Sequence, residues 1–206
     1  MGSPTLTMPT VTALRDEGRG RVGVDLDGTR WRTMPLVAVV KAGLGVGVEL
    51  DRPRARCLRR ELRRSDALAT AGRVLSRHDL PLRSLDRRLE RAGVAPATRS
   101  EAIDTLARAG LVDDQRFAVA RAEALAARGR GDASIRWDLE RQGVSPGDIE
   151  RAVEALEPER ERARAIAERK GRTLQTARSL SRNGFADDSV EAAVGTVAEE
   201  GPGALG

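Results

Sequence analysis

The strongest catalytic pattern in the chain is the run Asp25-Leu26-Asp27-Gly28-Thr29. An aspartate followed two residues later by Asp-Gly-Thr is typical of phosphotransferases whose first aspartate attacks phosphorus. That aspartate lies at the end of a buried parallel strand, and the reaction also needs a Ser or Thr, a Lys and a second acidic pair at later strand ends. The elements around Asp25 therefore decide whether it is a nucleophile.

The residues around this run predict a β-hairpin and not a buried parallel strand. Apolar and polar residues alternate over 21–26 and again over 30–34, and Asp27-Gly28 between them is a strong turn signal. No βαβ pattern follows, and the later pair Asp113-Asp114 is better explained by Asp113 as the N-cap of a helix. We interpret Asp25 as a strand residue, and since no other catalytic motif is present we expect a binding protein and not an enzyme.

Composition limits the remaining classes. The chain has 206 residues, a formal net charge of +5 and only 2% aromatic residues, and its single cysteine (Cys57) and single histidine (His78) allow neither a disulfide framework nor a zinc ligand set. A reducing, cytoplasmic setting fits this cysteine usage. No apolar run approaches the roughly 20 residues of a membrane span, and the N-terminus lacks the pattern of a signal peptide.

Positive charge is concentrated in residues 51–64, where seven arginines face only two acidic residues, Asp51 and Glu61. Such a basic segment favours a polyanion or an acidic protein surface as partner. The alternative is that a GC-rich genome supplies arginine freely and that these side chains cover a solvated helix. Both interpretations remain open at this point.

Three aligned glycines reveal a repeat from residue 65 onward. The segments beginning "LERAGV", "LERQGV" and "LSRNGF" place Leu89, Leu139 and Leu180 at one position and Gly93, Gly143 and Gly184 at another. Each copy is expected to form a helix, a loop, a second helix that ends at the glycine, and a third helix that begins near a proline in the first two copies. The predicted fold is mainly α, an elongated array of three tandem three-helix repeats behind a small N-terminal region with a β-hairpin.

The expected organisation follows from these boundaries. We predict disordered tails at both ends, a small hairpin-and-helix region with a helix stopped by Gly43, a basic linker helix and three repeats. In chain order these segments are 1–10, 11–50, 51–64, 65–110, 113–157, 159–198 and 199–206.

Candidate contact residues are those that the repeat pattern turns away from the core. The position six residues before each glycine holds Arg87, Trp137 and Arg178, and arginine and tryptophan are common interface anchors. For Trp137 the alternative is packing between repeats. The position two residues before each glycine holds an arginine, which would stabilise a helix C-terminus or contact a polyanion. The other candidates are Arg91, Arg128, Arg130, Arg136, Arg141, Lys170, Arg172 and Arg182.

Residues 109–156 resemble the central block of the RecX family, bacterial regulators of the RecA recombinase. The family pattern G-[YL]-[LVI]-[DN]-D-x-[RK]-[FY]-A is matched by the run from Gly110 to Ala118, and the following basic R-G-x-G loop by 128–131. The resemblance extends over about 11–198, with a diverged third repeat and with Leu111 where Tyr is usual. The family positions that we assign a structural role are Gly110, Asp113, Asp114, Arg116, Phe117 and Gly143.

This resemblance implies that the elongated array of three-helix units is curved, and it also implies a function. RecX proteins bind the RecA–single-stranded-DNA filament and inhibit its extension, ATPase, strand exchange and co-protease activity in recombination and the SOS response, and they need no cofactor. It also implies a cytoplasmic monomer that contacts DNA phosphates independently of sequence. The alternative is a stand-alone nucleic-acid-binding regulator that uses its three-helix units like helix-turn-helix modules.

Overall fold

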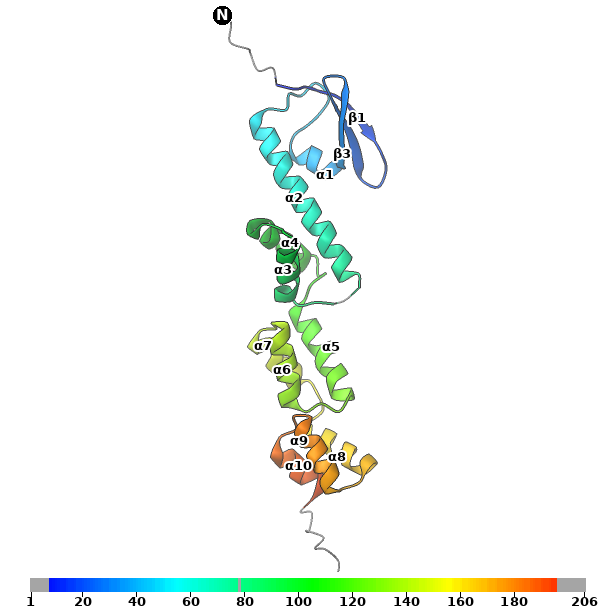
Figure 1. Ribbon diagram of the computed structural model, residues 1–206, viewed down its shortest axis with the longest axis vertical. Coiled ribbons are helices and arrows are strands. Elements are labelled where there is room, and N and C mark those ends of the chain that lie inside the picture. The colour runs from blue at the N-terminus through cyan, green and yellow to red at the C-terminus, as the bar shows by residue number, and fades with distance from the viewer. Residues whose placement is uncertain (1–7, 78, 196–206) are drawn as a thin grey trace, which may run out of the picture. The chain divides into compact units, whose positions relative to one another are not determined.

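The computed structural model describes residues 8–77 and 79–195, which form a small sheet followed by ten helices (Figure 1). His78 and the predicted tail 199–206 lie outside the described residues. The described chain divides into two compact units, one made of residues 8–77 and 86–109 and the other of 79–85 and 110–195. The predicted mainly helical fold with a β-containing N-terminal region is confirmed.

The sheet of the first unit has three antiparallel strands in the order β1 (Val11–Asp16), β2 (Arg21–Leu26) and β3 (Thr29–Pro35). Asp27 and Gly28 connect β2 to β3 with φ angles of 48° and 81°, which is the conformation of a tight hairpin turn between twisted strands. The hairpin prediction is therefore confirmed. Strand β1, which the alternation did not single out, completes the sheet.

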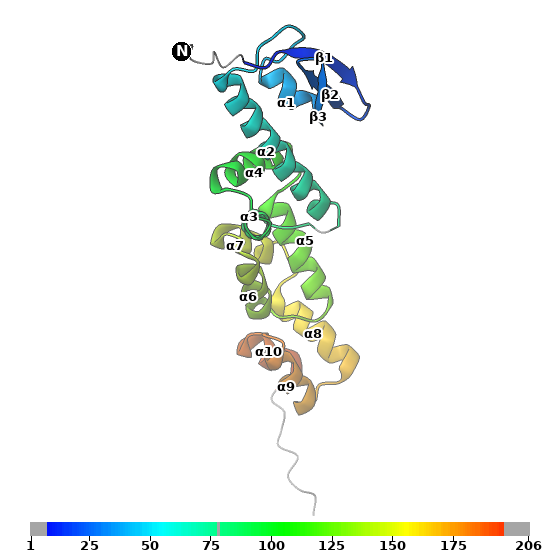
Figure 2. The same ribbon diagram turned by 45° about the horizontal axis from the view of Figure 1, so that its top comes forward.

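One face of the sheet carries the core of the N-terminal region. Val22, Val24 and Met34 are buried on this face and pack with α1 (Leu36–Lys41) and with Leu58 of α2 (Arg52–Leu75). Figure 2 shows α1 and the start of α2 beside the strands. Helix α1 ends before Gly43, whose φ of 63° suits a glycine stop, as predicted.

Asp25 lies on the opposite face of the sheet and is nevertheless 5% exposed. Arg15 contacts its carboxylate at 2.9 Å and Arg30 at 3.4 Å, so two long side chains cover it. The Arg30 guanidinium also lies over Gly23, where no Cβ is in the way. Simple alternation would leave Asp25 in solvent, but here it is the acidic partner of two arginines.

The ordered part of the chain begins before the predicted boundary at residue 11. Thr10 pairs with Glu49, and the N–H of Leu50 donates to the carbonyl of Pro9 at 2.8 Å. Backbone hydrogen bonds of this kind hold residues against the fold, so the predicted tail 1–10 is wrong for its last residues. Residues 1–7 lie outside the described chain.

Helix α2 is longer than the predicted linker helix. It begins after Asp51, whose carboxylate accepts the N–H of Arg54 at 2.8 Å, and it continues for 24 residues to Leu75. The boundary expected between 64 and 65 lies inside this helix, because no glycine or proline interrupts the sequence there. The second half of α2 packs against α4 (Pro96–Arg108), where Arg64 donates to Thr105 Oγ1 at 3.0 Å.

Helix α3 (Leu82–Arg91) lies between α2 and α4 in the chain. These three helices form the first of three modules. The second module has α5 (Asp114–Ala127), α6 (Asp132–Gln142) and α7 (Pro146–Glu154). The third has α8 (Glu159–Lys170), α9 (Leu174–Arg182) and α10 (Asp187–Val194). None of the helices among the described residues is long and apolar enough to cross a membrane.

The second helix of each module ends at a glycine with a left-handed backbone, as predicted. The φ angles are 78° at Gly93, 89° at Gly143 and 84° at Gly184. The cores of the second and third modules contain several alanines beside larger residues, for example Ala118 and Ala122 beside Ile135, with Phe117 half-buried against them. Small side chains let helices approach closely, and this compensates for the scarcity of aromatic residues.

Candidate functional site

Trp137 lies on the exposed side of α6 and is 58% exposed. Its neighbours Ile135 and Leu139 are completely buried on the other side of the helix, as their spacing predicts. The Cζ atom of Arg141, one turn later, lies 4.6 Å from the centroid of the tryptophan ring, in the range of a cation–π contact. Trp137 is therefore a surface residue that packs with Arg141, and the alternative of a residue packed between repeats is wrong.

Every module carries an exposed pair at these two positions of its second helix. The pairs occupy the positions six and two residues before the glycine, so the two members are one helical turn apart. We call them the outer pairs, and they are Arg87 and Arg91 on α3, Trp137 and Arg141 on α6, and Arg178 and Arg182 on α9. In α3 the Nε of Arg91 donates to the carbonyl of Arg87 at 3.3 Å.

The two aspartates of the family motif have different roles. Asp113 caps α5 by accepting the N–H of Arg116 at 2.9 Å, as predicted, and the Arg116 guanidinium donates to the Gly110 carbonyl at 3.2 Å. Asp114 instead accepts the N–H of Leu82, the first residue of α3, at 2.7 Å. Burial raises the pKa of Asp114 above its ordinary value, while the Leu82 N–H acts in the opposite direction.

The same joint occurs between the second and third modules. Glu159, the first residue of α8, accepts the N–H of Asp132, the first residue of α6, at 2.6 Å. Its other carboxylate oxygen accepts the N–H of Ala186 at 3.0 Å. In both joints an acidic side chain at the start of one module accepts from the start of the second helix of the preceding module, as Asp114 does from Leu82.

Two of the three glycines that end the second helices also belong to these joints. A Cβ on Gly143 would lie 2.9 Å from the Cβ of Arg83, and a Cβ on Gly184 would lie 2.7 Å from the backbone nitrogen of Ser134. The N–H of Gly131 donates to the carbonyl of Asn183 at 2.9 Å. At Gly143 and Gly184 glycine is therefore required twice, by the backbone conformation and by the close approach of the preceding module.

Arg162 of α8 is buried in the second joint, with 9% exposure. Its guanidinium donates to the carbonyls of Glu157 and Arg130 at 2.9 and 3.0 Å and forms an ion pair with Asp132. The Phe185 ring lies beside it. Sequence reasoning missed this residue, although Arg162 lies four residues before Ile166, which packs against the core of the third module, and a charged residue on an apolar face is an available signal.

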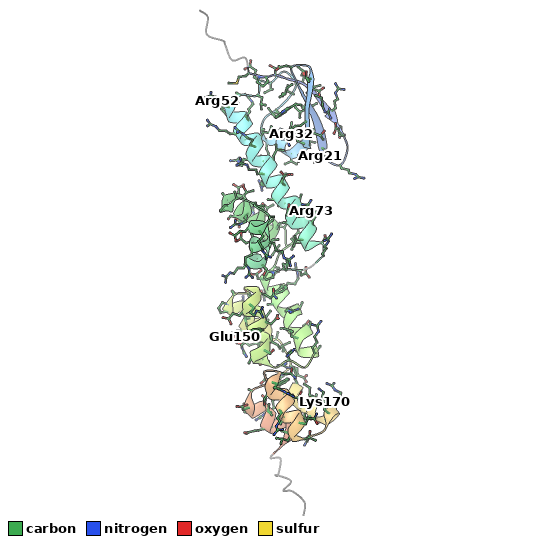
Figure 3. The ribbon with its side chains drawn as sticks, viewed as in Figure 1. Arg21, Arg32, Arg52, Arg73, Glu150 and Lys170 are labelled. Atoms are coloured by element: carbon green, nitrogen blue, oxygen red, sulfur yellow. The ribbon has the colours of Figure 1, made fainter. Side chains whose placement is uncertain are left out.

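Three of the predicted contact arginines pair with polar or acidic side chains of the protein. Arg130 donates to the side-chain oxygen of Asn183 at 3.0 Å, Arg136 donates to both carboxylate oxygens of Glu150, and Arg172 lies 3.9 Å from the Glu168 carboxylate. The ion pair raises the pKa of Arg136 and lowers that of Glu150. Figure 3 shows Lys170 at the end of α8. The candidates that are exposed in the loops or at the helix ends before them are Arg128, Arg130, Lys170 and Arg172.

The arrangement offers groups that suit binding. Within residues 8–77 and 79–195 no group of three or more His, Cys, Asp or Glu side chains could hold a metal ion. The outer pairs present guanidinium groups and one indole ring, which suit acidic side chains, phosphates and flat apolar surfaces. In each outer pair the two residues lie one turn apart on the same helix.

Comparisons with known proteins agree with this architecture. Residues 113–153, which include most of the second module, match the family model described as the second three-helix domain of RecX. Regulatory protein RecX of Halorhodospira halophila is 32% identical over 147 residues, which cover 66% of this chain and 91% of that protein. Regulatory protein RecX of Acidithiobacillus ferrooxidans is 37% identical over 84 residues, which cover 41% of this chain and 56% of that protein.

Solved structures share the fold. A crystal structure of regulatory protein RecX matches with a TM-score of 0.78 and 18% identity and covers 90% of this chain and 98% of its own. The structure of RecX from Lactobacillus salivarius matches with a TM-score of 0.57 and 19% identity over 64% of this chain and 94% of its own. The relative that is 32% identical and matched over nine-tenths of its length shows that the chain belongs to the RecX family of regulatory proteins.

Proposed function

We propose that this protein binds the RecA–single-stranded-DNA filament and inhibits its extension, ATPase, strand exchange and co-protease activity. Membership of the RecX family supports a regulatory role. A regulator of this kind works by binding, and the site described above contains binding groups only. DNA phosphates and acidic groups of the recombinase are the partners that exposed arginines would meet.

The observation that carries the proposal is the repetition of the outer pairs. Each module places an exposed pair at the same two helical positions, and every pair has at least one arginine. A filament presents the same acidic groups again at each protomer, so a repeated protein surface can meet a repeated partner at more than one point. Trp137 with Arg141 combines the two residue types that contribute most at protein interfaces.

The direct test is the DNA-dependent ATPase of the cognate recombinase titrated with this protein. We expect inhibition by the wild-type chain and about tenfold weaker inhibition by the double variant Trp137→Ala/Arg141→Ala, since one interface anchor contributes roughly 1–2 kcal/mol. Trp31→Ala/Arg32→Ala is the matched control, because it removes an exposed tryptophan and an exposed arginine from the N-terminal sheet.

Two results would contradict the proposal in different ways. Unchanged hydrolysis with stoichiometric wild-type protein would show that the chain does not regulate the recombinase. Normal inhibition by Trp137→Ala/Arg141→Ala, with unchanged helicity by circular dichroism, would show that the contact surface lies elsewhere.

A further inference from the structure

The arginines of the basic segment fall into two groups once the structure is known. Three of the seven arginines over 52–64 pair with the two acidic residues of the segment. Arg54 contacts Asp51 at 2.5 Å, while Arg60 and Arg64 contact Glu61 at 3.4 and 3.9 Å. These contacts lie within α2 and its N-cap, and the buried Glu61 also pairs with Lys41 of α1 at 3.2 Å, which ties α2 to the N-terminal region.

The other four arginines lie along one side of α2. They are separated by four, three and four residues, a spacing that keeps side chains on the same side of a helix. All four are exposed, and among the residues that the structure describes none of them has a carboxylate within ion-pair distance. We call them the arginine row, and they are Arg52, Arg56, Arg59 and Arg63.

The row faces away from the core of the first unit. Leu58 and Glu61, on the other side of the helix, are buried against the N-terminal region. Figure 3 shows Arg52 at the first turn of α2, on the side away from the strands. With a rise of about 1.5 Å per residue the row is roughly 16 Å long, and its members follow one another at about one helical turn.

We propose that the arginine row binds the phosphate backbone of a DNA strand independently of base sequence. Evenly spaced guanidinium groups on a straight helix match a partner whose negative charges are themselves evenly spaced, as phosphates are. The row contains no aromatic or large aliphatic side chain, whereas a protein interface needs such anchors. A membrane surface would need an apolar face on the same helix, and the apolar face of α2 is buried in the core.

A surface hollow adjoins the C-terminal end of the row. It has a volume of about 340 Å³ and is lined by Arg63, by Thr70 of α2, and by Gly93 and Thr98 from the end of α3 and the start of α4. Asp66 of α2 also lines the hollow, and its carboxylate would repel a phosphate. The proposed phosphate-binding row therefore ends at Arg63, and the hollow is not part of it.

The test uses the full chain and no recombinase, so its result does not depend on the function proposed above. Fluorescent 30-mer oligonucleotides, single-stranded and duplex, are titrated with protein at several salt concentrations. The double variant Arg56→Ala/Arg63→Ala should bind about tenfold more weakly, since two ion pairs are lost. Its slope of log affinity against log salt concentration should be smaller by about 1.4 on single strands, because each phosphate contact contributes roughly 0.7.

Two further variants distinguish the effect of the arginine row from the effect of the total charge of the protein. Arg108→Ala/Arg160→Ala removes the same charge from exposed positions on α4 and α8 and should bind within about twofold of the wild type. Arg56→Lys/Arg63→Lys should retain most of the affinity, because lysine still contacts phosphate as a point charge.

Several outcomes would overturn the proposal. These are wild-type affinity in Arg56→Ala/Arg63→Ala, an equal loss in the Arg108→Ala/Arg160→Ala control, and a loss confined to one of the two oligonucleotide forms. Normal DNA binding combined with weaker binding to an assembled recombinase filament would assign the row to a protein partner instead. All variants change exposed side chains, and thermal unfolding confirms that each is folded.

Discussion

Replacing Arg162 by methionine should destabilise the second unit by about 3 kcal/mol. The substitution introduces an apolar side chain of similar length, removes the donors to two backbone carbonyls and leaves Asp132 with only the Arg136 guanidinium, at 3.9 Å. Removing one member of a buried ion pair costs roughly 3–5 kcal/mol. The Asp132 side chain is 23% exposed, so water reaches it after the substitution and the lower end of this range applies.

Urea denaturation followed by circular dichroism measures this loss as a change in the free energy of unfolding. In a unit of roughly 100 residues, 3 kcal/mol corresponds to a fall in Tm of about 12 °C. Arg160→Met, at an exposed position on the same helix, is the control and should change stability by less than about 0.5 kcal/mol.

A double-mutant cycle with Asp132→Asn isolates the pair. The double variant should be less destabilised than the sum of the single variants, by roughly 1–3 kcal/mol, because each single variant already removes the same contact. A loss below about 1 kcal/mol in Arg162→Met, or strict additivity in the cycle, would refute the inference that Arg162 holds the joint between the second and third modules.

Two further predictions concern the joints. Gly184→Ala should lower the free energy of unfolding by roughly 2–4 kcal/mol in urea denaturation, because it strains a φ of +84° and clashes with Ser134. Gly93→Ala, with open space around the glycine, should lower it by only about 1–2 kcal/mol. Equal losses would show that packing adds nothing at Gly184. The raised pKa of Asp114 means that the folded state binds a proton more tightly, so this residue's contribution to stability falls as pH rises from the unfolded-state value through the higher folded-state pKa. Asp114→Asn keeps an acceptor for Leu82, so its stability relative to the wild type should rise between about pH 4 and about pH 7; a constant difference would contradict the assignment.

Local signals in the sequence predicted local structure correctly. The turn at Asp27-Gly28, the N-cap at Asp113 and the glycine stops of the second helices depend on residues close together in the chain. Helix α2 shows the limit of such signals, since nothing at residue 64 marks where its contacts change from the N-terminal region to α4. Strand β1 is stabilised by pairing with β2, and the pairing is not visible in its own pattern.

The candidate site was predictable where it depends on helical register. The exposure of Trp137 follows from the burial of Ile135 and Leu139 on the same helix. The partners of Arg130 and Arg136 come from other elements, 53 and 14 residues away in the chain, so the sequence alone did not indicate that these two arginines are paired. The joints likewise connect residues 32 and 27 positions apart, and no local pattern pairs Asp114 with its donor.

The second module contains both halves of the joint. Its Asp114 and Gly143 contact the start of α3. In the same way, Glu159 and Gly184 of the third module contact the start of its own α6. The start of α6 in this module and the surface formed by its Asp114 and Gly143 are therefore the two complementary halves of one head-to-tail interface. A second copy of it, inserted in tandem after the first, would find at each end the contacts it already uses, and the chain could be lengthened by one module without any new interface.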